Sequence, residues 1–230
     1  DQTGGSDSNT PVVKPYSLLN AEGRKPGSIG AVIVPITSID SSFSISTSKG
    51  LTSFNDPAVP ALLVAAQYLE TVEGPLWNAV RGNGLAYGAY FGKEVDGGYV
   101  HFKTYRSPMA AKAIMAARDT IKALADGTTP LEKPMVEGAI SQIVMTMADE
   151  QSTMAMAAVQ NFVSSVIRGL EPDFNQKLLA KIRGVAEDQI RKAITDWLLP
   201  AFYPESSNVV VTCAPIMVEV SAYMYPDGTG

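Results

Sequence analysis

The 230-residue chain contains only one histidine, His101, and only one cysteine, Cys213. Zinc sites draw most of their ligands from these two residue types, and hydrolytic triads use a histidine base, so we do not expect the chain by itself to hold catalytic zinc. A single cysteine cannot form an internal disulfide, and nothing therefore indicates an oxidising compartment. We interpret His101 as a structural histidine with satisfied hydrogen bonds and Cys213 as a core residue.

Clustered positive charge and long apolar runs are also missing. The formal net charge is −5, whereas nucleic acids and anionic membranes attract clusters of Lys and Arg, so we expect no nucleic acid and no membrane as a partner. Plain apolar stretches such as residues 62–66 are far shorter than the roughly 18 residues that a transmembrane helix needs.

The N-terminal sequence lacks the features of a targeting segment. Residues 1–10 have neither the basic start nor the apolar run of a signal peptide, and the first residue is not Met. We expect a processed chain or a piece of a longer one. A cytoplasmic location is favoured, and the mitochondrial matrix stays open because a presequence would lie upstream of these residues.

The composition is that of a folded domain, with 46% hydrophobic and 18% charged residues. Residues 1–27 are rich in Gly, Ser, Pro and Asn and predict a linker or irregular lead-in, which leaves residues 28–230 as the domain. Apolar and alternating runs predict strands at 29–36, 43–46, 85–91, 99–106 and 208–214, of which the first and last should be buried. Along 99–106, odd-numbered and even-numbered side chains should point to opposite faces, with Arg106 beside Phe102 and Thr104.

Helical spacing and Gly or Pro punctuation predict the helices. One begins at Pro57 with Asp56 as its cap, and a short one covers 76–81. Others are expected near 108–125, 131–149, 153–168, 172–183 and 186–199. Residues 217–225 fit a strand or a helix. Strands first, helices in the middle and a strand at the end predict one α+β domain, a mainly antiparallel sheet with helices packed on one face.

The segment 82–88, with the sequence GNGLAYG, resembles a dinucleotide-binding loop only superficially. Tyr87 stands where a third glycine is needed, and the segment leads from helix to strand, whereas a phosphate loop leads from strand to helix. A helix end and a glycine-rich strand entry explain the segment structurally. The functional alternative is a pair: Arg81 and Tyr87 are residue types that polarise a peptide carbonyl or hold an oxyanion.

Residues 68–77 (YLETVEGPLW) and 80–88 (VRGNGLAYG) together resemble the C-terminal half of pitrilysin-type zinc metallopeptidases, the superfamily of insulin-degrading enzyme. The presequence-protease branch is the more similar one, through Leu76-Trp77, the six-residue step from Arg81 to Tyr87, and the aromatic hairpin that ends at residues 105–107. A weaker similarity covers 185–190 and 197–200, so the resemblance extends over about residues 28–215.

The resemblance implies a function for the chain as one part of a larger enzyme. Such proteases carry four related α+β modules in two halves that close around a peptide. The first module binds zinc through an inverted His-x-x-Glu-His motif, and the last contributes an Arg and a Tyr to the substrate. Those two match Arg81 and Tyr87, whereas the zinc motif is absent from this sequence. The implied cofactor of the parent enzyme is zinc, and the implied partners are a peptide substrate and the N-terminal zinc-bearing half of the same protease.

Two functions stay open. In the first, the chain is the C-terminal substrate-binding module of a zinc metalloendopeptidase and is inactive alone. In the second, it is a non-catalytic structural or partner-binding subunit, as in processing-peptidase and respiratory-core relatives. The presence of Arg81 and Tyr87 favours the first.

Other candidate residues have plainer explanations. The acidic pairs Asp149-Glu150 and Glu187-Asp188 are interpreted as helix-end residues, and Tyr105-Arg106 as a strand pair or a second substrate contact. Four methionines lie on two successive predicted helices: Met145, Met147, Met154 and Met156. We expect them to fill the core, and the alternative is that they line a groove for peptides.

Overall fold

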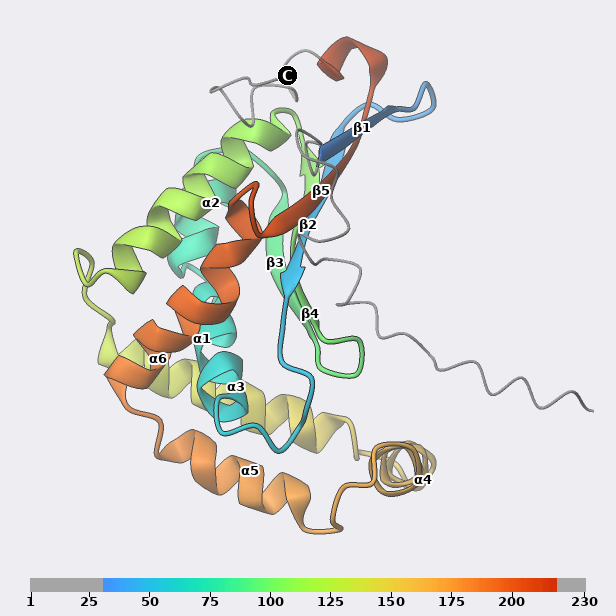
Figure 1. Ribbon diagram of the computed structural model, residues 1–230, viewed down its shortest axis with the longest axis vertical. Helices are drawn as coiled ribbons and strands as arrows, with labels where there is room; N and C mark the ends of the chain where they lie inside the picture. The colour runs from blue at the N-terminus through green and yellow to red at the C-terminus, as the bar shows by residue number, and fades with distance from the viewer. Residues whose placement is uncertain (1–30, 219–230) are drawn as a thin grey trace, which may run out of the picture.

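A computed structural model describes residues 31–218 and shows a five-stranded sheet with helices on one face (Figure 1). The strands are β1 (Ala31–Pro35), β2 (Ser42–Lys49), β3 (Gly88–Glu94), β4 (Tyr99–Ser107) and β5 (Ser207–Cys213). Their spatial order is β1-β5-β2-β4-β3; β1 pairs with β5 in parallel, and the other three pairings are antiparallel. The predicted α+β fold with a mainly antiparallel sheet is confirmed.

The helices follow the predicted ranges closely. They are α1 (Val59–Glu70), α2 (Ala110–Ala125), α3 (Lys133–Asp149), α4 (Met154–Phe162), α5 (Phe174–Arg183) and α6 (Glu187–Ala193). Wide π-type turns form η3 (Trp77–Arg81) and extend α4 and α6 as η4 (Val163–Ile167) and η5 (Ile194–Leu198); tighter 3₁₀ turns form η6 (Leu199–Phe202) and η7 (Pro215–Met217). In Figure 1, α1, α2 and α6 lie beside the sheet, and α3, α4 and α5 gather at one end.

Two predicted element starts are wrong. The Asp56 carboxylate accepts the backbone N–H of Ala58 at 2.8 Å, so it closes a turn ahead of α1, which begins two residues later than predicted. Strand β3 begins at Gly88, not at residue 85, because the chain needs the preceding residues to turn out of η3.

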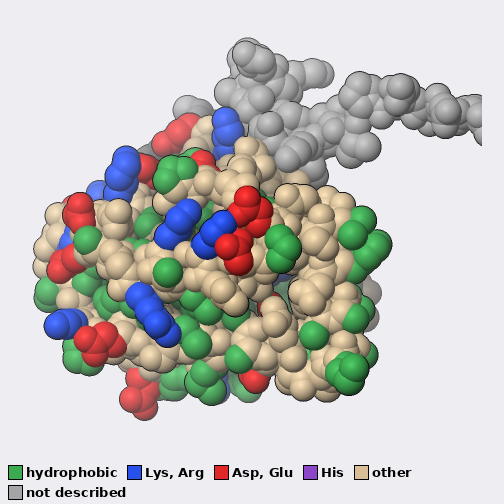
Figure 2. Space-filling view, turned by 90° about the horizontal axis from the view of Figure 1, so that it is seen from below, with side chains coloured by type: hydrophobic (Ala, Val, Ile, Leu, Met, Phe, Trp, Pro, Cys, Tyr) green, Lys and Arg blue, Asp and Glu red, His purple; other side chains and the backbone are tan. Residues whose placement is uncertain are grey.

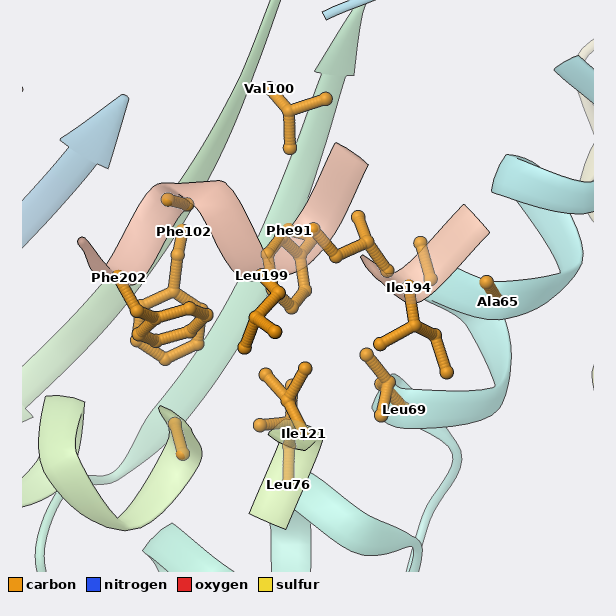
Figure 3. Close-up of a cluster of buried hydrophobic side chains, with 14 of the residues drawn as sticks. Ala65, Leu69, Leu76, Phe91, Val100, Phe102, Ile121, Ile194, Leu199 and Phe202 are labelled. Atoms are coloured by element: carbon orange, nitrogen blue, oxygen red, sulfur yellow. The ribbon is translucent and has the colours of Figure 1, made fainter. Parts of the chain in front are cut away.

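The core lies between the sheet and the helices that cover it. Phe91 of β3, Phe102 of β4 and Phe202 of η6 pack ring against ring, with centroids 4.7 to 6.1 Å apart (Figure 3). Leu69 of α1 and Ile194 of η5 approach this group from the helix side. Aromatic packing at these distances stabilises a core beyond the area that it buries.

Serine side chains line the inner face of β2. Ser42, Ser44, Ser46 and Ser48 are buried, while the alternate residues of the strand are only partly so. The Ser46 hydroxyl donates to the carbonyl of Ala201 in η6, and the Ser44 hydroxyl lies 2.6 Å from that of Thr104 on β4. Small side chains here allow η6 to approach the sheet. Hydrogen bonds offset the burial of the Ser44 and Ser46 hydroxyls, whereas the buried Ser48 hydroxyl has no hydrogen-bond partner among the described residues.

The first strand differs from its prediction. It was expected to be buried, but Val32 and Val34 are exposed because β1 forms one edge of the sheet and the helices do not reach its outer face. The predicted lead-in, residues 1–27, and most of 217–225 lie outside the described residues. Among residues 31–218, none of the helices combines the length and apolar character that crossing a membrane would need.

Candidate functional site

Arg81 is placed at the exposed end of the π-type turn η3. The N–H of Gly82 donates to the carbonyl of Trp77 at 2.7 Å, five residues back, which widens the turn. The side-chain amide of Asn83 then caps two further carbonyls, those of Asn78 at 3.0 Å and Ala79 at 3.2 Å. These bonds fix the backbone that carries Arg81, although its own side chain is exposed.

Tyr87 lies directly against Arg81. Its backbone N–H is shared by the carbonyls of Tyr105 and Arg106, each at 3.1 Å, and its side chain is 58% exposed. The Arg81 guanidinium carbon lies 4.6 Å from the centroid of the Tyr87 ring, within the range of a cation–π contact. The two residues singled out from the sequence are therefore adjacent.

Strand β4 contributes Tyr105 to the site and has a bulge at the next residue, Arg106. Arg106 has φ +50°, a left-handed conformation that is uncommon for a residue with a side chain, and the pairing with β2 shifts register here. The predicted placement of Arg106 beside Thr104 is consequently wrong: Thr104 is buried and Arg106 is exposed. Tyr105 packs edge-on against Tyr87, with ring centroids 6.2 Å apart, and against Phe43 at 5.4 Å.

A pocket of about 140 Å³ opens beside the pair. Its lining includes Arg81, Tyr87 and Tyr90 together with Leu76 and Trp77. Glu70, the last residue of α1, is also part of the lining. Arg81 and Tyr87 therefore border a small pocket as well as each other.

Glu70 is a functional candidate that the sequence analysis missed. Its carboxylate accepts the outward-facing N–H of Phe91, on edge strand β3, at 2.5 Å. Burial raises the pKa of Glu70, an effect that nearby Lys93 and this hydrogen bond oppose. One feature of the sequence could have drawn attention to it: Glu70 is the only charged residue of α1.

The structure tests the remaining sequence candidates. Cys213 is buried, as predicted for a core residue. Asp149 ends α3, Glu150 caps it, and Glu187 and Asp188 open α6, which confirms their helix-end interpretation. His101 is buried, but its Nδ1 has no hydrogen-bond partner among the described residues, so the prediction of a fully satisfied histidine is wrong.

The methionine prediction is mostly wrong. Met147 packs partly against the core, whereas Met145, Met154 and Met156 are exposed. Met154 and Met156 belong to α4, which buries none of its residues, and Met145 lies on α3, which buries only Ala139 and Ile143. Within residues 31–218, no three His, Cys, Asp or Glu side chains are grouped so as to hold a metal ion.

Comparison with known proteins finds relatives that are much longer. No protein-family model matches the chain. It is 28% identical to the uncharacterized protein C3H1.02c of Schizosaccharomyces pombe over 94% of the chain, and 26% identical to the uncharacterized protein YOL098C of Saccharomyces cerevisiae over 91%. The chain spans only about a fifth of these relatives, 21% and 20% of their lengths.

Several solved structures with similar folds are described as proteases or peptidase domains. A protease from Helicobacter pylori matches 80% of this chain with 43% of its own, at a TM-score of 0.66 and 12% identity. The inactive domain of an M16 peptidase from Pseudomonas fluorescens matches 80% of this chain with 43% of its own, at a TM-score of 0.59 and 16% identity. The ferredoxin protease FusC, solved in complex with Arabidopsis ferredoxin, matches 80% of this chain with 20% of its own, at a TM-score of 0.57 and 12% identity. The fold is that of M16-like, or pitrilysin-type, peptidase domains.

Proposed function

We propose that the chain is the C-terminal substrate-binding module of a zinc metalloendopeptidase, inactive alone, in which another module holds the zinc. The observation that carries the proposal is the contact between Arg81 and Tyr87, both exposed, at the rim of a pocket. The similar folds, which include an inactive domain of an M16 peptidase, support a non-catalytic module of this type.

The geometry suits recognition of a peptide carbonyl. The guanidinium has several N–H donors, and the phenol of Tyr87 adds an O–H donor beside it. Two donors aimed at one carbonyl oxygen polarise it and stabilise the negative charge that develops when water attacks. In this proposal Arg81 and Tyr87 act on the carbonyl, and zinc-bound water comes from the zinc-bearing half of the same protein.

Placement in the presequence-protease branch is part of the proposal. It rests on Leu76-Trp77 and on the six-residue step from Arg81 to Tyr87. In the structure, Trp77 begins η3 and lines the same pocket as the pair, so these residues form one local unit.

Crosslinking tests whether a peptide reaches this site. In the longest natural polypeptide that contains the chain, a bound peptide with a photoreactive group beside its cleaved bond should label the tryptic segment 82–93, which includes Tyr87 and Tyr90. The Arg81→Ala variant loses the cleavage site after residue 81, so there the label is quantified on the longer tryptic segment 50–93, and it should be reduced. Arg118→Ala, which removes a partly exposed arginine of α2, should leave labelling unchanged. Labelling that avoids this segment in the wild type would contradict the proposal.

A further inference from the structure

The helix formed by α4 and η4 presents an uncovered apolar surface. Ala155, Val159, Phe162 and Val166, here called the apolar stripe, recur at helical spacing along one side. The last three are 62%, 55% and 66% exposed, and neither α4 nor η4 buries any side chain.

The surroundings of the stripe carry no charge. Residues 151–167 contain no Asp, Glu, Lys or Arg. In Figure 2 the surface at the right, where α4 lies in Figure 1, shows apolar and uncharged side chains, while Lys, Arg, Asp and Glu gather over the other elements. Surfaces of folded proteins that contact only water seldom leave so long a helix without charge.

Polar contacts at both ends hold this helix in place. Thr153 caps it by accepting the N–H of Met156 at 3.2 Å. At the other end Arg168 donates twice to Asp96 in the β3–β4 turn, at 2.8 and 3.1 Å, and lies over the ring of Phe54. The stripe is therefore presented in a fixed position.

The energetics indicate that something covers the stripe. A helix of this length is marginally stable in water unless an apolar face packs against a partner. The space behind the helix is a pocket of about 190 Å³ lined by residues such as Leu62, Met147 and Gln160, so its inner side packs loosely as well. Burying three large apolar side chains against a partner would remove their apolar surface from water and so stabilise the helix.

We propose that the apolar stripe docks against another module of the same longer polypeptide. The curated relatives are about five times longer than the chain, and in two of the similar solved structures a domain of this fold accounts for 43% of a longer chain. Interfaces without charge resemble a domain core cut in half, and they are typical of permanent contacts. A contact within one polypeptide is permanent in this sense.

Other occupants suit the chemistry less well. Helices that lie on membrane surfaces carry Lys and Arg along their polar side, and residues 151–167 have neither. A peptide substrate would need a surface that is free in the assembled enzyme. The inference shares with the proposed function only the premise of a longer polypeptide, and it involves neither Arg81 nor Tyr87.

Cysteine labelling in the longest natural polypeptide tests the inference. Val159→Cys and, separately, Phe162→Cys are reacted with a maleimide, and the modified peptide is quantified by mass spectrometry. The control is Lys192→Cys on α6, a site whose native side chain is 76% exposed. We expect both stripe cysteines to react at least about tenfold more slowly than Cys introduced at 192, because labelling then requires the interface to open.

Three results would overturn the inference. The stripe cysteines would react as fast as the control if the surface is free. Protection that disappears on dilution would show that a second copy covers the stripe. Protection that appears only with phosphatidylcholine–phosphatidylserine vesicles would show a membrane contact. Melting curves of each variant establish that it is folded, and the use of two stripe positions guards against one variant that fails to fold.

Discussion

The ring of His101 on β4 lies across Gly92 on the neighbouring strand β3, so closely that a Cβ atom added at position 92 would stand 1.9 Å from its Nε2. The two residues are direct cross-strand partners. The ring also lies 5.8 Å from that of Tyr99. The absence of a side chain at position 92 is therefore what allows the histidine to be buried in the sheet.

Gly92→Ala should destabilise the fold. The new methyl group forces the buried His101 ring to move, and such overpacking typically costs about 1–3 kcal/mol. Gly138→Ala in α3 is the matched control: nothing lies within 4 Å of its added Cβ, and replacing a helical glycine should stabilise by roughly 0.5–1 kcal/mol. Urea denaturation of both variants measures the difference, and equal stability would contradict the described packing.

His101 should make stability depend on pH. Burial lowers its pKa below the ordinary 6.5, with Lys103 and Lys93 adding to the effect and Glu94 opposing it. The unfolded chain then binds the proton more readily, so stability is present above pH 6.5 and lost as the pH falls through the folded-state pKa. Between pH 7 and pH 5 the free energy of unfolding should fall more in the wild type than in His101→Gln. Parallel pH profiles would contradict this prediction.

Glu70→Gln should stabilise the protein at pH 7.5. Burial raises the pKa of Glu70 above 4.5, so the stability linked to its protonated form is lost as the pH rises through the folded-state pKa. Glutamine keeps an acceptor for the N–H of Phe91 without a buried charge. The advantage of the variant in thermal melting should shrink toward pH 4.5. A variant less stable than wild type at pH 7.5 would mean that the charged hydrogen bond outweighs the cost of burial.

The purified chain should contain no stoichiometric zinc. It has one histidine and one cysteine, and the described part of the chain groups no metal-binding side chains. Elemental analysis after desalting measures this directly. One tightly held zinc per chain would show that the zinc site of the proposed enzyme is not confined to another module.

Local patterns predicted the elements of this fold better than their orientation. Helical spacing and Gly or Pro punctuation predicted a helix near 153–168, the range of α4 and η4, because these signals lie close together in the sequence. The alternation in β2 predicts a strand but not which of its two faces is buried. The serines face the helices, since η6 approaches the sheet at Ser46. That approach joins residues 155 positions apart, which no local pattern records.

At the candidate site, too, residues close together in the sequence were predicted and residues from distant segments were not. Arg81 and Tyr87 were found because they share one short segment, and a resemblance drew attention to their spacing. Tyr105 was only an alternative, since its ring contacts with Tyr87 and with Phe43 of β2 join residues that lie far apart in the sequence. Glu70 comes from a different element and meets the pocket only through packing of α1 on β3.

Peptide turnover by the longest natural polypeptide is the most direct test of the proposed role of Arg81 and Tyr87. Arg81→Ala and Tyr87→Phe should each lower kcat by roughly 10²–10³, the usual loss when one oxyanion contact is removed. Zinc content and melting temperature should stay nearly unchanged, because both side chains are exposed and phenylalanine keeps the ring that contacts Arg81 and Tyr105. Full activity in both variants, measured beside Arg118→Ala, would contradict the account.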